Sequence, residues 1–177
     1  MSQVVLAREP SAQLFLGSLA AALVLNLLPW PPTWPIPDLL AVCLVSWALL
    51  LPGRSLLWPA WLLGLLMDVH QGVLLGEHAL AYSLLAYGAV TLHRRLSGFS
   101  AFGQAAHLAA LFALAEASLL IVRWVGTATP PSLYAVILVA ANTLAWVFLH
   151  KLLLGLLSRR PRVRAAKARA RSNQPML

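Results

Sequence analysis

Residues 39–51 read LLAVCLVSWALLL, an apolar run that contains no charged side chain. Asp38 precedes the run in the position of a helix N-cap, and Pro52 follows its last residue. The strands of a membrane β-barrel would alternate apolar and polar residues, so a continuous run favours a helix. Similar runs recur along the chain, and we therefore predict an all-α integral membrane protein with six transmembrane helices.

The composition agrees with lipid as the surrounding solvent. Hydrophobic residues make up 60% of the 177 residues and charged residues only 10%, unlike a soluble domain. The net charge of +8 comes largely from basic residues after the last apolar run, where a membrane explains them and no nucleic-acid partner is expected. Cys43 is the one cysteine, so no intramolecular disulfide can form.

The lengths of the apolar runs set the predicted spans, because a bilayer needs roughly twenty apolar helical residues. One transmembrane domain over residues 1–157 is expected, with spans at 11–28, 38–51, 55–69, 72–93, 101–125 and 131–157. The second and third spans are short, so a re-entrant hairpin is an alternative. Such a hairpin would leave Arg54 deep in the membrane, at about 2.5 to 3.5 kcal/mol on insertion scales, and two true spans are favoured.

The basic residues also predict the orientation. Arg8, Arg54, the pair Arg94 and Arg95, and the C-terminal basic run occupy alternate connectors, while the other three connectors lack Lys and Arg. The positive-inside rule then places both termini in the cytoplasm. Arg123, near the outer end of the fifth span, is the exception, and we expect it to reach toward the external headgroups.

The tail, residues 158–177, is basic and has no apolar face. We expect it to be disordered in the cytoplasm and to serve as a topological anchor. The alternative is that it binds anionic lipid, at about 1 kcal/mol per basic residue near the surface. The candidate lipid contacts are Arg159, Arg160, Arg162 and Arg164.

Ionisable side chains inside spans are costly and therefore mark candidate sites. Asp68 and Glu77 flank the turn between the third and fourth spans, where interfacial hydrogen bonds would fix the turn. A proton or ion site that also uses His70 and His78 is the alternative, although these spacings match no tight metal motif. The candidate structural polar residues are Asp38, Glu77, His78, Glu116 and Arg123.

Glu116 lies near the middle of the fifth span and needs a partner in that medium. Arg123 is seven residues further on, about two helical turns or 10 Å away, so we do not expect a direct pair. We propose Asn142 in the sixth span, or a histidine of another helix, as the partner of Glu116.

Candidate groups for catalysis are lacking in the sequence. An enzyme nucleophile needs an activating base beside it, and neither Ser83 nor Ser118 has such a setting. No glycine-rich loop that could hold phosphate appears. We therefore expect neither enzymatic activity nor a cofactor.

Small residues recur at a helical spacing around the third connector. Gly64, Asp68, Gly72 and Gly76 lie four residues apart, and Gly72 to Gly76 forms a small-xxx-small step at the predicted start of the fourth span. Small residues allow helix backbones to approach closely in a membrane. These positions, together with Ala79, are candidates for packing within the chain or for binding a partner helix, and both readings stay open.

The region from Pro37 to Arg95 carries a resemblance. It contains an Asp-x-x-x-Gly-x-x-Leu-Gly-x-x-Ala-Leu pattern, formed by Asp68, Gly72, Leu75, Gly76, Ala79 and Leu80. In this pattern the chain resembles the family of rod shape-determining protein MreD. The other spans agree with that family in number and hydrophobicity.

The resemblance implies a non-enzymatic subunit of the bacterial cell-elongation machinery. Such a subunit is expected to bind MreC directly and, through it, MreB and the peptidoglycan synthases, and a homodimer within the complex stays open. The family also looks similar in fold to the substrate-binding subunits of energy-coupling-factor transporters. The alternative function is therefore a vitamin-like small-solute binding subunit, which would need an external pocket of several hundred Å³ lined by aromatic side chains.

Overall fold

The computed structural model describes residues 11–31, 34–96, 98–128 and 134–172, with residues 101 and 158–172 described by their backbone alone. Six helices and no strand lie in these ranges, so the prediction of an all-α chain is confirmed. The helices are α1 (Ala12–Leu27), α2 (Leu39–Leu50), α3 (Leu57–Gln71), α4 (Glu77–Leu96), α5 (Ala101–Thr127) and α6 (Tyr134–Ser172).

Polar side chains begin three of the helices. Ser11 accepts a hydrogen bond from the Leu14 N–H at the start of α1, and Ser100 accepts one from Gly103 at the start of α5. At the start of α2, Asp38 accepts from the Ala41 N–H at 3.0 Å, as its position before the apolar run predicts. Each cap satisfies a donor that a helix leaves unpaired in its first turn.

The start of α4 differs from the predicted span of 72–93, because the helix begins five residues later at Glu77. Gly72 is the C-cap of α3, with a left-handed φ of 63°, and Gly76 has a φ of 103°. Both values are readily reached by glycine and rarely by other residues. The two glycines therefore shape a turn between helices instead of opening a helix.

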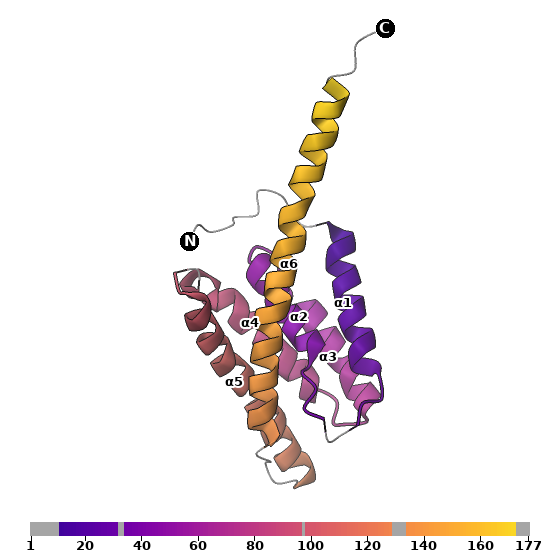
Figure 1. Cartoon of the computed structure of the whole chain (residues 1–177). Coiled ribbons are helices and arrows are strands. Elements are labelled where there is room, and N and C mark those ends of the chain that lie inside the picture. The colour runs from indigo at the N-terminus through magenta and orange to yellow at the C-terminus, as the bar shows by residue number, and fades with distance from the viewer. Residues whose placement is uncertain (1–10, 32–33, 97, 129–133, 173–177) are drawn as a thin grey trace.

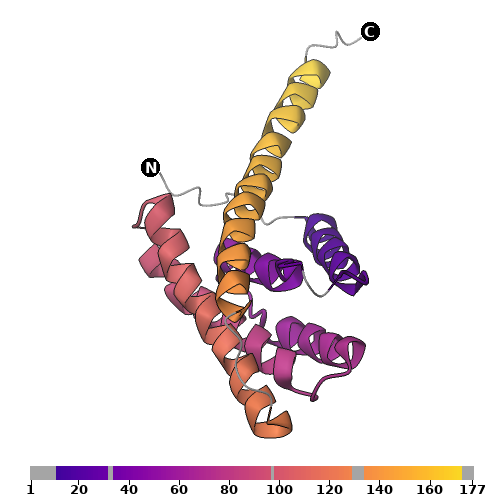
Figure 2. The same cartoon turned by 60° about the horizontal axis from the view of Figure 1, so that its bottom comes forward.

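Helix α2 lies at the centre of the molecule, between α1, α4 and α6 (Figures 1 and 2). All of its residues from Leu40 to Leu49 are buried, and none is more than 8% exposed. Successive helices run in alternating directions, so α1, α3 and α5 end on the same side of the molecule (Figure 1). The turn between α3 and α4 lies on that side as well.

Helices α3 and α4 approach each other closely where Gly64 faces Ala79. A Cβ atom built on Gly64 would lie 2.5 Å from the backbone nitrogen of Ala79, which is too close for any side chain. Backbone contact of this kind is typical of small residues between membrane helices. Gly64 and Ala79 therefore pack within the chain, on faces buried between the two helices.

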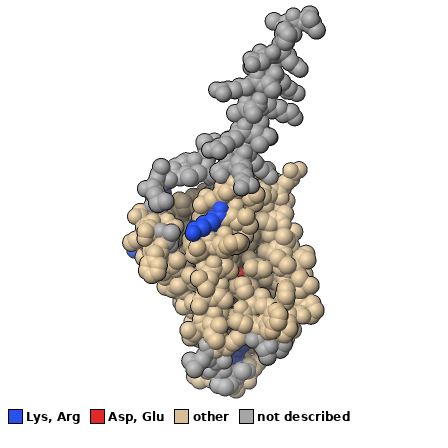
Figure 3. Space-filling view, viewed as in Figure 1, with Lys and Arg blue, Asp and Glu red and all other residues tan. Residues whose placement is uncertain are grey.

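The outer surface is apolar. Figure 3 shows a face on which few described residues are charged, and large apolar side chains such as Leu75 (72%) and Val125 (79%) are exposed on α5 and on the turn before α4. Among the described helices, Phe102–Thr127 and Tyr134–Leu157 are long and apolar enough to cross a bilayer, whereas Ala12–Leu27 and Leu39–Leu50 are shorter apolar helices.

Helix α6 continues beyond Leu157 to Ser172, so the described backbone of the tail is helical. The sequence analysis expected this segment to be disordered. Alanine, arginine and lysine dominate residues 162–171, and all three have high intrinsic helix propensity. The side chains of Arg159, Arg160, Arg162 and Arg164 lie outside the described residues, so their contact with lipid stays a prediction.

Candidate functional site

Asp68 connects the end of α3 to the start of α4. It is fully buried, and its Oδ1 atom accepts from the His78 backbone N–H at 2.7 Å and lies 2.8 Å from His78 Nδ1. Its Oδ2 atom accepts from the Gly76 N–H at 2.8 Å. Asp68 thus caps α4 with a side chain from the preceding helix, and its negative charge faces the positive end of the α4 dipole.

Glu77 connects α4 to α5 through an ion pair with Arg123. The Arg123 Nε–H donates to Glu77 Oε1. The Glu77 side chain is 1% exposed and the Arg123 side chain is 41% exposed, so the pair is buried at its acidic end only. The sequence predicted that Arg123 reaches toward headgroups, and it missed this partner because the two residues are 46 positions apart.

Asp38 joins four helices in a third group of bonds. Its carboxylate accepts from Asn26 Nδ2 on α1 at 2.6 Å and from the Tyr82 hydroxyl on α4 at 2.6 Å, in addition to capping α2. Its backbone N–H donates to Asn142 Oδ1 on α6 at 2.7 Å. Asn26 Oδ1 also accepts from the Leu39 N–H at 3.1 Å.

The Asp38 and Asp68 groups are neighbours. The rings of Tyr82 and His78 meet edge to face with their centroids 6.0 Å apart, and these two side chains bind Asp38 and Asp68 respectively. The sequence analysis did not single out Asn26 or Tyr82. A lone amide in an apolar span was the available signal for Asn26, because such groups need internal partners.

Glu116 does not bind the partner proposed for it, and the pairing with Asn142 is wrong. The Asn142 amide oxygen accepts from Asp38 instead. Glu116 is half-buried near the middle of α5, and no other described residue forms a hydrogen bond or ion pair with it.

The expected small-residue stripe separates into two parts in the structure. Gly64 and Ala79 pack against each other, and Asp68 is buried between the same helices. Gly72 and Gly76 lie in the turn, and a Cβ atom on either would meet nothing within 4 Å. The expectation that they form a packing step on a helix is therefore wrong, because their φ angles end one helix and precede the next.

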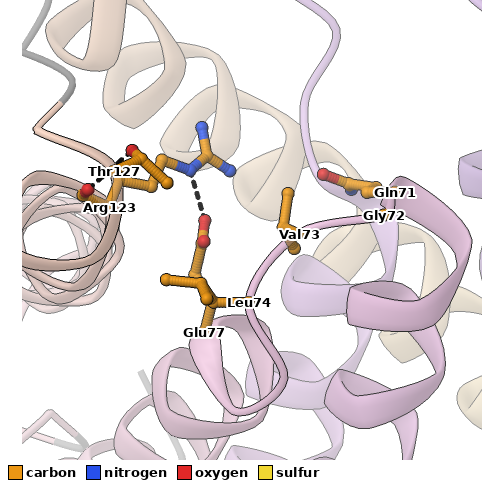
Figure 4. Close-up of a pocket in the computed structure, with 7 residues that line it drawn as sticks. All are labelled: Gln71, Gly72, Val73, Leu74, Glu77, Arg123 and Thr127. Atoms are coloured by element: carbon orange, nitrogen blue, oxygen red, sulfur yellow. Dashed lines mark hydrogen bonds and ion pairs between the residues drawn. The ribbon is translucent and has the colours of Figure 1, made fainter.

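A cavity of about 490 Å³ lies beside the Glu77–Arg123 ion pair (Figure 4). Its lining comes from the end of α3, the turn, the first residue of α4, and α5, and consists of Gln71, Gly72, Val73, Leu74, Glu77, Arg123 and Thr127. Within the described part of the chain, no group of three or more His, Cys, Asp or Glu side chains is placed to hold a metal ion. The charged side chains of the lining are Glu77 and Arg123, and the buried Glu77 is bound to Arg123 on α5.

The family of the chain follows from a comparison with known families. A family model described as rod shape-determining protein MreD matches residues 11–157, a range that begins just before α1 and ends within α6. The chain belongs to the MreD family. As a member of the MreD family it is a membrane protein of rod-shape determination, in a family of structural shape-determining proteins that is not known for enzymes.

The resemblance of the MreD family to vitamin-binding transporter subunits finds no support here. No solved structure matches the chain. Among the residues that the structure describes, none of those lining the cavity beside Arg123 is aromatic, whereas a vitamin site was expected to be lined by aromatic side chains.

Proposed function

We propose that this MreD family member is a non-enzymatic subunit of the bacterial cell-elongation complex that binds MreC in the inner membrane. Through MreC it helps organise MreB and the peptidoglycan synthases. The observation that carries the proposal is the family match over residues 11–157, which covers α1 to α5 and the part of α6 up to Leu157. The proposed orientation has both termini in the cytoplasm, and a homodimer within the complex is compatible with it.

The use of the polar side chains supports a bracing role. Asp38, Asp68 and Glu77 are each bound to a neighbouring helix, and together they connect all six helices to one another. Hydrogen bonds between helices hold membrane domains in one arrangement, since no water competes for the donors. A rigid body of this kind can hold the single transmembrane helix of MreC in a fixed position.

The position of Glu116 suggests where the MreC helix binds. A carboxyl group in the middle of a membrane helix is costly unless it is paired, and no described residue of the chain pairs with Glu116. We therefore propose that the MreC helix packs against the Glu116 face of α5 and supplies a hydrogen-bond donor. MreC binding would then satisfy a carboxyl group that has no hydrogen-bond partner among the described residues of the chain.

Depletion of the protein in its host tests the general function. We expect rod-shaped cells to become spherical, because the complex that elongates the wall would lose its membrane subunit. Re-expression of the chain should restore rods. Cells that stay rod-shaped after the protein has disappeared from their membranes would contradict the proposed function.

Co-purification with MreC tests the proposed contact. We expect Glu116→Leu to reduce recovered MreC about tenfold, which corresponds to one lost hydrogen bond to a charged group. Leu114→Ile is the matched control, because Leu114 is 55% exposed on the same helix, and it should leave recovery unchanged. Equal recovery by Glu116→Leu and the unmodified chain, at equal expression, would remove this face from the proposal.

A further inference from the structure

The cavity beside Arg123 has a charged wall whose donors are only partly used. One N–H of the guanidinium, at Nε, donates to Glu77. The two terminal nitrogens point away from Glu77 (Figure 4). Because a guanidinium carries five donors in a planar fork, these groups can hold an oxyanion while Nε stays bound to Glu77.

The position of the cavity along α5 corresponds to the headgroup level of a bilayer. Arg123 lies one turn from the end of Phe102–Thr127, which is long and apolar enough to span the membrane. Trp124 is 61% exposed beside it, and exposed tryptophan is enriched where acyl chains meet headgroups. Leu74 lines the cavity and is 42% exposed, and Leu75 beside it in the turn is 72% exposed, so the turn provides an apolar surface at the cavity.

The charge of the site limits which oxyanion suits it. Glu77 is 1% exposed and already neutralises Arg123, so a ligand with a net negative charge would leave an excess charge at the membrane interface. A zwitterionic ligand would leave none. Its phosphate would bind the terminal nitrogens of Arg123, and its cationic end would face Glu77 or the side-chain oxygen of Gln71.

We propose that the cavity binds the headgroup of a zwitterionic phospholipid, with phosphate on Arg123 and the acyl chains along Leu74 and Leu75. The volume of about 490 Å³ falls in the range of about 300 to 1,000 Å³ that is usual for ligand sites. The bound lipid would brace the turn between α3 and α4 against α5. This site is separate from Glu116 and does not depend on MreC.

Lipid retention by the full chain tests the proposal. The protein would be reconstituted in nanodiscs with equal amounts of phosphatidylethanolamine and phosphatidylglycerol, extracted in detergent, and measured by native mass spectrometry. We expect a phosphatidylethanolamine adduct about tenfold above the phosphatidylglycerol adduct, since losing one charged hydrogen bond corresponds to about that factor. Val73→Trp fills the cavity from the turn, keeps the ion pair, and should reduce the adduct about tenfold.

The control for the added bulk is Val136→Trp, because Val136 is 66% exposed on α6 and outside the cavity lining. It should retain lipid like the unmodified chain. Arg123→Gln should also lose the adduct, and Val73→Trp remains the decisive variant if the loss of the ion pair unfolds that protein. An undiminished adduct in folded Val73→Trp would overturn the site, and equal retention of both lipids would overturn the zwitterionic assignment. Displacement of the lipid by millimolar inorganic phosphate would assign the cavity to free phosphate.

Discussion

Asp68 replaces the capping residue that α4 lacks. Glutamate at the first position of α4 points to Arg123, and the turn before it contains Gly76, which has no side chain to offer. The carboxylate of Asp68 therefore accepts from Gly76 and His78 across the turn. Since the group is fully buried, each of these bonds forms in a medium without competing water, where a charge-assisted bond is strong.

Asp68→Asn tests this role at the level of one side chain. The amide places an N–H₂ group against backbone donors, so at least one bond is lost and a donor is left unpaired. We expect a loss of about 2 to 3 kcal/mol in the free energy of unfolding, as for hydrogen bonds to charged groups. Thermal unfolding in detergent measures it, and His70→Gln, an exposed position near the same turn, is the control. Equal stability of the two variants would contradict the capping role.

The polar side chains differ in how far along the sequence their partners lie. Asp68 was expected to fix the turn because it is an ionisable residue that flanks the turn, and the groups that it binds, on Gly76 and His78, are only 8 and 10 positions away. Glu77 and Arg123 are 46 positions apart, and Asp38 and Asn142 are 104 apart. A single sequence gives no register between such distant helices, so those partners could not be chosen from spacing alone.

Among the elements, the pair α3 and α4 is held by backbone proximity. The two backbones can approach this closely at Gly64 because glycine has no side chain. The sequence identified Gly64 through its spacing with other small residues. It misplaced Gly72 and Gly76, because a four-residue spacing fits a helix and a turn equally well when the φ angles are unknown.

Substitution of Gly64 tests the close approach. We expect Gly64→Ala to destabilise the protein by about 1 to 3 kcal/mol, because the added methyl group would overlap the Ala79 backbone and separate the helices. Gly17→Ala is the matched control, since a Cβ at Gly17 in α1 meets nothing within 4 Å. The control should be neutral or more stable by up to about 1 kcal/mol, because alanine has the higher helix propensity. Equal unfolding temperatures for the two variants would contradict the close packing.

For the whole molecule, the continuous apolar runs and their proline breaks predicted six helices, and the structure has six in its described part. The ends of most helices lie within a few residues of the predicted spans, because capping residues and prolines act locally. The length of α6 and the central place of α2 were not predicted. Central burial is a property of the assembled bundle, and α2 differs little in composition from its lipid-facing neighbours.

The proposed orientation has a direct test in cysteine labelling. In a Cys43→Ala background, His70→Cys should react with a membrane-impermeant maleimide added to spheroplasts, since His70 precedes the turn at the predicted external side. Gly53→Cys, next to Arg54 at the predicted cytoplasmic side, should react only after the membrane is permeabilised. The opposite pattern would contradict an orientation with both termini in the cytoplasm.

The hydrogen bond between the Asp38 backbone and the Asn142 side chain also bears on biosynthesis. It joins positions 104 residues apart, and a ribosome adding about 5 to 20 residues per second needs roughly 5 to 20 s to cover that distance. During this interval the face of α2 that packs against α6 in the finished fold is uncovered, because α6 has not yet been synthesised. Chains interrupted before α6 would keep that surface of α2 uncovered, and we expect membrane proteases to degrade them faster than the full chain.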